Sequence, residues 1–217
     1  MSAPRAERVT IAGPAGAIEA LVEIPAGDDG DAAVPTRFGV VCHPHPLYGG
    51  TLDNKVVYIV ARAFNELGVP TIRFNFRGVG GSSGEHADGY GETADAMAVI
   101  AYGRERWPGA ALWLGGFSFG GAVAVRAAMR AGAERLVTVA PGITRVAMEG
   151  IGSVGCPWLI VQGDADDVIE PAAVLAWARQ QAPPRPAVRL LHGAGHFFHG
   201  RLNELRTVIV DFLSSQK

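Results

Sequence analysis

The sequence predicts an α/β fold with a mostly parallel central sheet covered by helices on both faces. Short apolar runs alternate with stretches of helical periodicity along the 217 residues, which indicates right-handed β-α-β crossovers. Runs such as 38–42 are continuously apolar, as expected of strands that are buried on both faces. A chain of this length is expected to fold as one domain over residues 1–217.

The first half of the chain opens with a predicted hairpin. Its strands, 8–11 and 18–24, flank the turn-like sequence Gly13-Pro14-Ala15-Gly16. A polar, glycine-rich loop over 26–36 leads to the buried strand 38–42. The segment 54–67 carries its apolar side chains at helical spacing and is closed by a glycine, so it is predicted to be a helix. A strand at 71–76 and a helix at 93–106 follow.

The second half continues the same alternation of short apolar runs and helical stretches. Strands are predicted at 110–114, 135–140, 157–162 and 187–191, and helices from Ser118 to about 131, at 171–181 and from about 201 to 213. In such a sheet the ligand crevice lies beyond the carboxyl ends of the strands. Residues with a chemical role are therefore expected in the loops that follow the strands.

Composition and charge exclude several classes of function. The net charge of −2 and the presence of only two lysines, Lys55 and Lys217, argue against nucleic acid as a partner. No apolar run approaches the roughly 20 residues that cross a bilayer, and the N-terminus lacks the apolar core of a signal peptide. We therefore expect a cytoplasmic protein without membrane partners, in which Cys42 and Cys156 are reduced, buried thiols.

One serine lies among glycines at a predicted strand-to-helix junction. The sequence Gly116-Phe117-Ser118-Phe119-Gly120 fits the pattern G-x-S-x-G, in which a sharp turn exposes the serine oxygen above the sheet. A flexible turn with an incidental serine is the plain alternative. The position between a strand and a helix favours a nucleophile, with the N–H of Phe119 directed at a developing oxyanion.

A nucleophilic serine needs a base and an acid, which in this type of fold follow it along the chain. His196 is the expected base, because it lies in a loop behind a glycine, whereas His192 ends a strand and His199 adjoins the last helix. The acid is expected after the strand 157–162. Three aspartates are available there, Asp164, Asp166 and Asp167, and one of them could instead cap the next helix.

A second oxyanion donor is expected in the loop after the strand 38–42. Pro44 and Pro46 have no N–H, so His45 is the best candidate, followed by Leu47. Aromatic and apolar residues of the same loops are expected to form the walls of the substrate site, in particular Leu47, Tyr48 and Phe197.

Taken together, these segments resemble the α/β-hydrolase superfamily, and in particular its small, lidless bacterial serine hydrolases related to dienelactone hydrolases and carboxylesterases. The resemblance covers the chain after the opening hairpin and rests on these segments: His43-Pro44 with Gly49-Gly50, the segment 75–82, the serine turn, Gly163-Asp164-Ala165-Asp166 and Gly195-His196-Phe197-Phe198. It implies that Asp166 is the acid of the triad. The early loop departs from the family, since it reads His-Pro-His where His-Gly is commoner.

The resemblance implies a serine esterase that cleaves a small carboxylic ester or thioester, without a cofactor or metal. A metal-dependent hydrolase using His43 and His45 is one alternative, and a catalytically inactive binding module of the same fold is another. The glycine-rich loop 77–84 lacks the nucleotide-binding patterns and a following lysine, so NAD and ATP are not expected.

Overall fold

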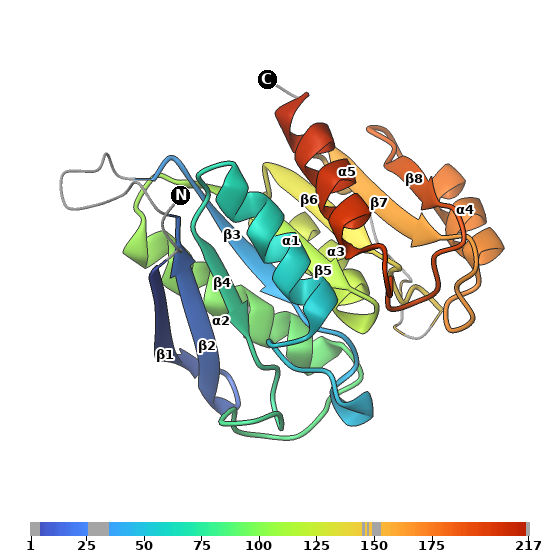
Figure 1. Ribbon diagram of the computed structural model, residues 1–217. Coiled ribbons are helices and arrows are strands. Elements are labelled where there is room, and N and C mark those ends of the chain that lie inside the picture. The colour runs from blue at the N-terminus through green and yellow to red at the C-terminus, as the bar shows by residue number, and fades with distance from the viewer. Residues whose placement is uncertain (1–4, 26–34, 145, 147, 149–152, 216–217) are drawn as a thin grey trace.

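Figure 1 shows the computed structural model of the protein, which describes residues 5–25, 35–144, 146, 148 and 153–215. Its strands are β1 (Arg5–Gly13), β2 (Gly16–Ile24), β3 (Arg37–Cys42), β4 (Thr71–Phe74), β5 (Ala111–Phe117), β6 (Arg135–Val139), β7 (Trp158–Gly163) and β8 (Ala187–Leu191). Its helices are α1 (Lys55–Glu66), α2 (Tyr90–Arg106), α3 (Phe119–Ala131), α4 (Pro171–Gln180) and α5 (Leu202–Ser214), with a short 3-10 turn, η1, at Pro46–Tyr48.

The strands form one sheet in the order β1-β2-β4-β3-β5-β6-β7-β8. The first two strands pair antiparallel with each other, β2 pairs antiparallel with β4, and the remaining pairs from β4 to β8 are parallel. This confirms the predicted opening hairpin and the mostly parallel sheet. In such a sheet the loops after β3, β5, β7 and β8 emerge at the same edge, where the crevice is expected.

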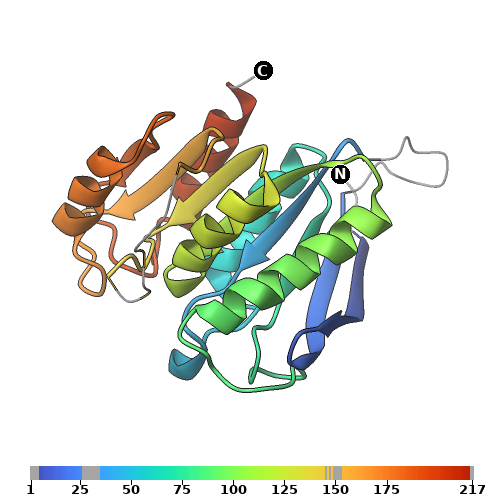
Figure 2. The same ribbon diagram turned by 180° about the vertical axis from the view of Figure 1, so that it is seen from behind.

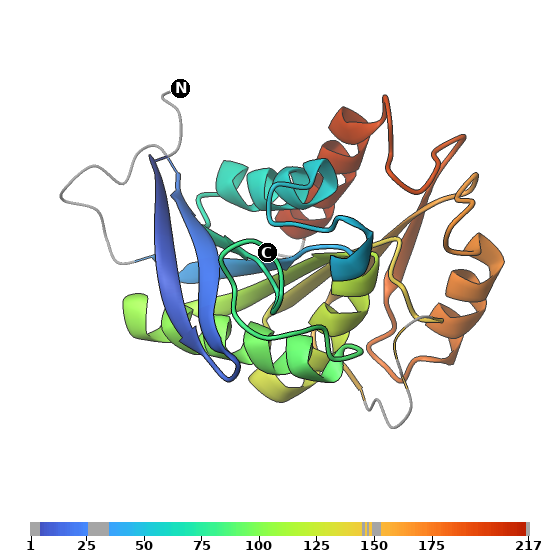
Figure 3. The ribbon, with the colours of Figure 1, turned by 90° about the horizontal axis from the view of Figure 1, so that it is seen from below.

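Helices cover both faces of the sheet, as Figures 1 and 2 show from opposite sides. One apolar layer joins α1 and α5 to the sheet, and a second joins α2, α3 and α4 to its other face. Figure 3 shows the sheet between these layers. The residues at the centre of the sheet are fully buried, so the continuous apolar run at 38–42 has the burial that its sequence predicts.

The structure differs from the prediction mainly at the ends of elements. Strand β5 runs on through Gly115 and Gly116 to Phe117, because both glycines pair with β3 and β6. A Cβ atom on Gly115 would lie 2.7 Å from a methyl of Val60, so a glycine lets α1 pack closely on the sheet. Helix α2 begins at Tyr90 because Glu92 accepts hydrogen bonds from the N–H groups in front of it.

Cys42 and Cys156 are buried free thiols, as predicted. Burial raises the pKa of the Cys156 thiol to about 11 and raises the pKa of Cys42 further, so neither is a ready nucleophile. Among the described residues, no helix combines the length and apolar character that a membrane crossing requires.

Candidate active site

Ser118 lies at the turn between the end of β5 and the start of α3. Its backbone is in a strained conformation, with φ 54° and ψ −121°, which ordinary residues rarely adopt. The two flanking glycines make the turn possible. A Cβ atom on Gly116 would lie 2.2 Å from the carbonyl oxygen of Gly120, and a Cβ on Gly120 would lie 2.2 Å from that of His43. The glycines are therefore required by close backbone contacts.

His196 lies in the loop after β8 and faces the serine. Its Nε2 atom lies 3.1 Å from Oγ of Ser118, although the two residues are 78 positions apart in the sequence. The imidazole ring packs between Phe117 and Phe197, with ring centroids 5.0 Å and 5.1 Å away. Both Ser118 and His196 are buried, so little water competes for this hydrogen bond.

Asp166, in the loop after β7, holds the other side of the imidazole. Its Oδ2 atom lies 2.9 Å from Nδ1 of His196, and its Oδ1 atom accepts the N–H groups of Val168 and Ile169. Burial by itself raises the pKa of Asp166, but the hydrogen bonds that the carboxylate accepts, that from His196 foremost, outweigh it, and the net pKa lies below its ordinary value. An ionised Asp166 fixes the tautomer in which Nε2 of His196 accepts the serine proton.

The other histidines and aspartates of these loops lie elsewhere. Asp164 contacts the exposed His192 and accepts the N–H of Gly193, so this pair holds the loop in front of His196. Asp167 is exposed. His199 is exposed as well, and its ring stacks on Phe197 outside the contact between His196 and the serine. Of the residues considered from sequence, the structure brings Ser118, His196 and Asp166 together.

The two expected oxyanion donors, Phe119 and His45, lie next to each other, and Phe119 directly follows the serine. Phe119 is the first residue of α3, where backbone N–H groups point out of the helix. The ring of His45 packs on the ring of Phe119 at 4.8 Å, so the loop after β3 lies directly against the start of α3. The N–H of Leu47 donates to Nδ1 of His45 at 3.3 Å, which leaves His45 as the stronger candidate of the two.

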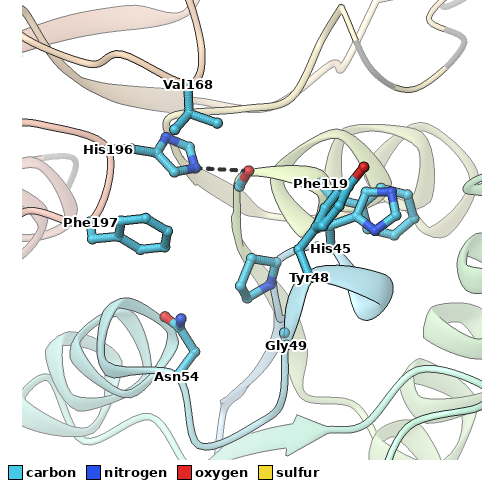
Figure 4. Close-up of a pocket in the computed structure, with 11 residues that line it drawn as sticks. His45, Tyr48, Gly49, Asn54, Phe119, Val168, His196 and Phe197 are labelled. Atoms are coloured by element: carbon cyan, nitrogen blue, oxygen red, sulfur yellow. Dashed lines mark hydrogen bonds between the residues drawn. The ribbon is translucent and has the colours of Figure 1, made fainter.

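A pocket of about 350 Å³ opens beside Ser118 (Figure 4). Its lining consists of Pro44, His45, Tyr48, Gly49, Gly50, Asn54, Ser118, Phe119, Val168, His196 and Phe197. Tyr48 and Phe197 thus line it as expected. The structure does not bring Leu47 to this pocket, because the turn η1 directs its side chain to solvent, where it is 69% exposed.

Sequence reasoning missed Asn54 and Val168. The sequence predicts that Asn54 begins the helix 54–67, and Val168 lies two residues after Asp166, but neither position indicates that the side chain lines a pocket. The only available signal was that both lie in or beside loops that follow parallel strands.

His43 has a structural role, which differs from the metal-binding role considered from the sequence. Its Nδ1 lies 2.6 Å from the carbonyl oxygen of Pro44, and its Nε2 accepts the N–H of Phe76 at 2.9 Å. Burial lowers the pKa of His43 to about 4, so the ring is neutral at ordinary pH. Metal binding would have to break one of these buried hydrogen bonds, which argues against a site shared by His43 and His45.

A strained serine between a central parallel strand and a helix defines the α/β-hydrolase fold. The comparisons agree, since a family model described as the alpha/beta hydrolase fold matches residues 45–144. An α/β serine hydrolase homologue from Coxiella burnetii is 40% identical, with a TM-score of 0.88 over 94% of this chain and 96% of that one. A serine hydrolase without a lid from Xanthomonas campestris is 37% identical, with a TM-score of 0.89 over 97% and 94% of the two chains.

An uncharacterized protein of Rickettsia prowazekii is 32% identical over 183 residues, which cover 80% of this chain and 77% of the relative. The chain belongs to the α/β-hydrolase family, and its fold matches that of the Xanthomonas campestris member, which has no lid.

Proposed function

We propose that the protein is a serine esterase that cleaves a small carboxylic ester or thioester through an acyl-enzyme, with Ser118, His196 and Asp166 as its catalytic triad. The observation that carries this proposal is the continuous chain of hydrogen bonds from Oγ of Ser118 through the imidazole to the buried carboxylate. This is the arrangement that turns a serine hydroxyl into a nucleophile.

In the first half of the reaction, Oγ of Ser118 attacks the carbonyl carbon while Nε2 of His196 takes the hydroxyl proton. The backbone N–H groups of Phe119 and His45 stabilise the negative oxygen of the tetrahedral intermediate. His196 then gives its proton to the leaving alcohol or thiol, and the acyl group stays on the serine. Asp166 stabilises the imidazolium ion and remains ionised throughout.

In the second half, water replaces the alcohol. His196 takes a proton from water as its oxygen attacks the acyl carbon, and the resulting intermediate collapses with return of the proton to Ser118. The acid leaves, and the free enzyme is restored. No step needs a cofactor.

The size of the pocket supports small substrates. A volume of about 350 Å³ lies at the lower end of the usual range for ligand sites. Its walls include the apolar side chains of Phe119, Val168 and Phe197, which suit a short acyl chain. Thioesters fit the same chemistry, because the leaving group is protonated by the same imidazole.

Labelling with a fluorophosphonate probe tests the nucleophile directly. The wild type should be labelled, whereas Ser118→Ala should not, and both Ser118→Ala and His196→Ala should lose about ten-thousandfold in kcat/KM on p-nitrophenyl acetate. A folded wild type that refuses the probe would favour the inactive binding module. A panel of p-nitrophenyl esters and acyl-CoA thioesters of increasing length then separates the two substrate classes.

A further inference from the structure

Two polar side chains in the pocket have no part in the proposed reaction, and one of them, Tyr48, is 78% exposed at its rim. Ser118 and His196 react, and the ring of His45 accepts the N–H of Leu47. Asn54 lies on the wall opposite His196, and its amide faces the pocket in Figure 4. The cap of α1 uses only one end of this amide, so the other end is available to a ligand in the pocket.

The cap fixes which end of the amide is available. Asn54 accepts the N–H groups of Val56 and Val57 at 2.9 Å and 3.4 Å, and only the oxygen Oδ1 can do so. The amide therefore cannot flip, and its NH2 group is held in a constant orientation. In the part of the chain that the structure describes, Nδ2 of Asn54 makes no hydrogen bond to another residue.

The rest of the lining carries no acidic side chain and no lysine or arginine. None of the eleven residues around the pocket is an aspartate, glutamate, lysine or arginine. A carboxylate on the substrate would find no lysine or arginine here, and an ammonium group would find no aspartate or glutamate. The group that matches an amide NH2 in a neutral, largely apolar pocket is an uncharged oxygen acceptor.

We propose that Asn54 determines specificity by donating a hydrogen bond from Nδ2 to an uncharged oxygen on the substrate, so that the preferred esters carry an ether, keto or hydroxyl oxygen in one arm. This inference rests on the esterase function proposed above. A plain hydrocarbon arm would strip water from Nδ2 without replacing the hydrogen bond, and a site that holds an unpaired donor discriminates against such a ligand.

The test compares esters that differ by one oxygen. For the acyl arm, p-nitrophenyl pentanoate is compared with two esters of the same length. An ether oxygen replaces the methylene at C4 in p-nitrophenyl β-methoxypropanoate and the methylene at C3 in p-nitrophenyl ethoxyacetate. For the alcohol arm, butyl acetate is compared with methoxyethyl acetate. The measured quantity is the ratio of kcat/KM for ether over hydrocarbon, and dividing the ratio of a variant by that of the wild type removes the intrinsic reactivity of each ester.

Two variants keep the cap and remove the amide NH2 group, since serine leaves only a shorter hydroxyl and aspartate leaves a carboxylate. Serine and aspartate both cap helices well, so Asn54→Ser and Asn54→Asp should melt near the wild-type temperature. In at least one arm the ether preference should fall about three- to tenfold in Asn54→Ser, as the loss of one neutral hydrogen bond predicts. Asn54→Asp, which presents a second acceptor to the ether, should reduce it at least as much. Tyr48→Phe, which removes a hydroxyl from the rim, should leave the ratio unchanged.

The possible failures are distinguishable. Ratios that agree with the wild type within about twofold in every pair, for both Asn54 variants, would overturn the inference while leaving the esterase function intact. A shift caused by Tyr48→Phe and not by the Asn54 variants would assign the donor to the rim instead. A wild type that hydrolyses none of the esters would overturn the proposed function, and this inference with it.

Discussion

Gln162 and Asp166 are joined by a buried hydrogen bond of 2.9 Å, from Nε2 of the amide to Oδ2 of the carboxylate. The same oxygen lies against Nδ1 of His196. Gln162 is at the end of β7 and is completely buried, and its NH2 group also faces the carbonyl oxygen of Gly163 at 3.2 Å. The strand thus orients the carboxylate, which in turn orients the imidazole.

Removal of this amide should weaken catalysis without removing a catalytic residue. In Gln162→Leu, Oδ2 of Asp166 loses one of its donors, so the pKa of the carboxylate rises and its orientation is less well fixed. We expect kcat on p-nitrophenyl acetate to fall about tenfold while KM changes little, because the substrate does not contact Gln162. An unchanged kcat in a folded variant would show that the backbone N–H groups of Val168 and Ile169 suffice to hold Asp166.

The three aspartates of the loop after β7 should differ sharply in their effect on activity. Asp166→Asn should lower kcat by about a thousandfold or more, because the amide favours the wrong tautomer of His196. Asp167→Ala should cost little, since Asp167 is exposed. Asp164→Asn should have an intermediate effect, through the loop that carries His196. Steady-state kinetics decide the matter, and equal losses at Asp166 and Asp167 would refute the acid assignment.

The strands and helices were predictable because their signals are local. Strands buried on both faces read as apolar runs, and the helices between them repeat apolar residues at helical spacing, so every element except the turn η1 could be located. The end of β5 was missed because Gly115 and Gly116 have poor strand propensity. Glycine is required at 115 because a side chain there would meet Val60 of α1, and at 116 because a side chain there would meet the backbone of Gly120 in α3, so both requirements come from packing against helices.

The candidate site could be predicted from sequence where the position of a loop relative to the strands determines which residues lie near the crevice. The rule that ligands lie beyond the carboxyl ends of parallel strands pointed to the correct loops, and a glycine before His196 distinguished it from His192. The direction of a side chain within a loop was not predictable. Leu47 and Asn54 both lie in the segment between β3 and the body of α1, yet Leu47 faces solvent and Asn54 faces the pocket.

The close contact between α3 and β3 predicts a large loss of stability in Gly120→Ala. The new methyl group would lie 2.2 Å from the carbonyl oxygen of His43, so it would meet backbone atoms and not a flexible side chain. We expect a loss of about 3 kcal/mol or more in the free energy of unfolding, measured by urea denaturation.

Gly132→Ala is the matched control. Gly132 also lies at an end of α3, with φ 64° and open space around it, so only the left-handed backbone should cost about 1 kcal/mol. Similar losses in the two variants would contradict the steric explanation.

The buried His43 predicts how stability depends on pH. Its pKa is lowered by burial from an ordinary 6.5 to about 4, so between these values the unfolded chain binds a proton that the folded chain does not. Because the unfolded state then binds more protons, the free energy of unfolding should fall as the pH is lowered from about 6.5 to about 4, by about 3 kcal/mol from this residue. Urea denaturation at a series of pH values measures the slope. His43→Gln removes the titrating ring, so its free energy of unfolding should depend less on pH over the same interval, whatever its absolute stability. Equal slopes in the two proteins would show that His43 titrates alike in the folded and unfolded states.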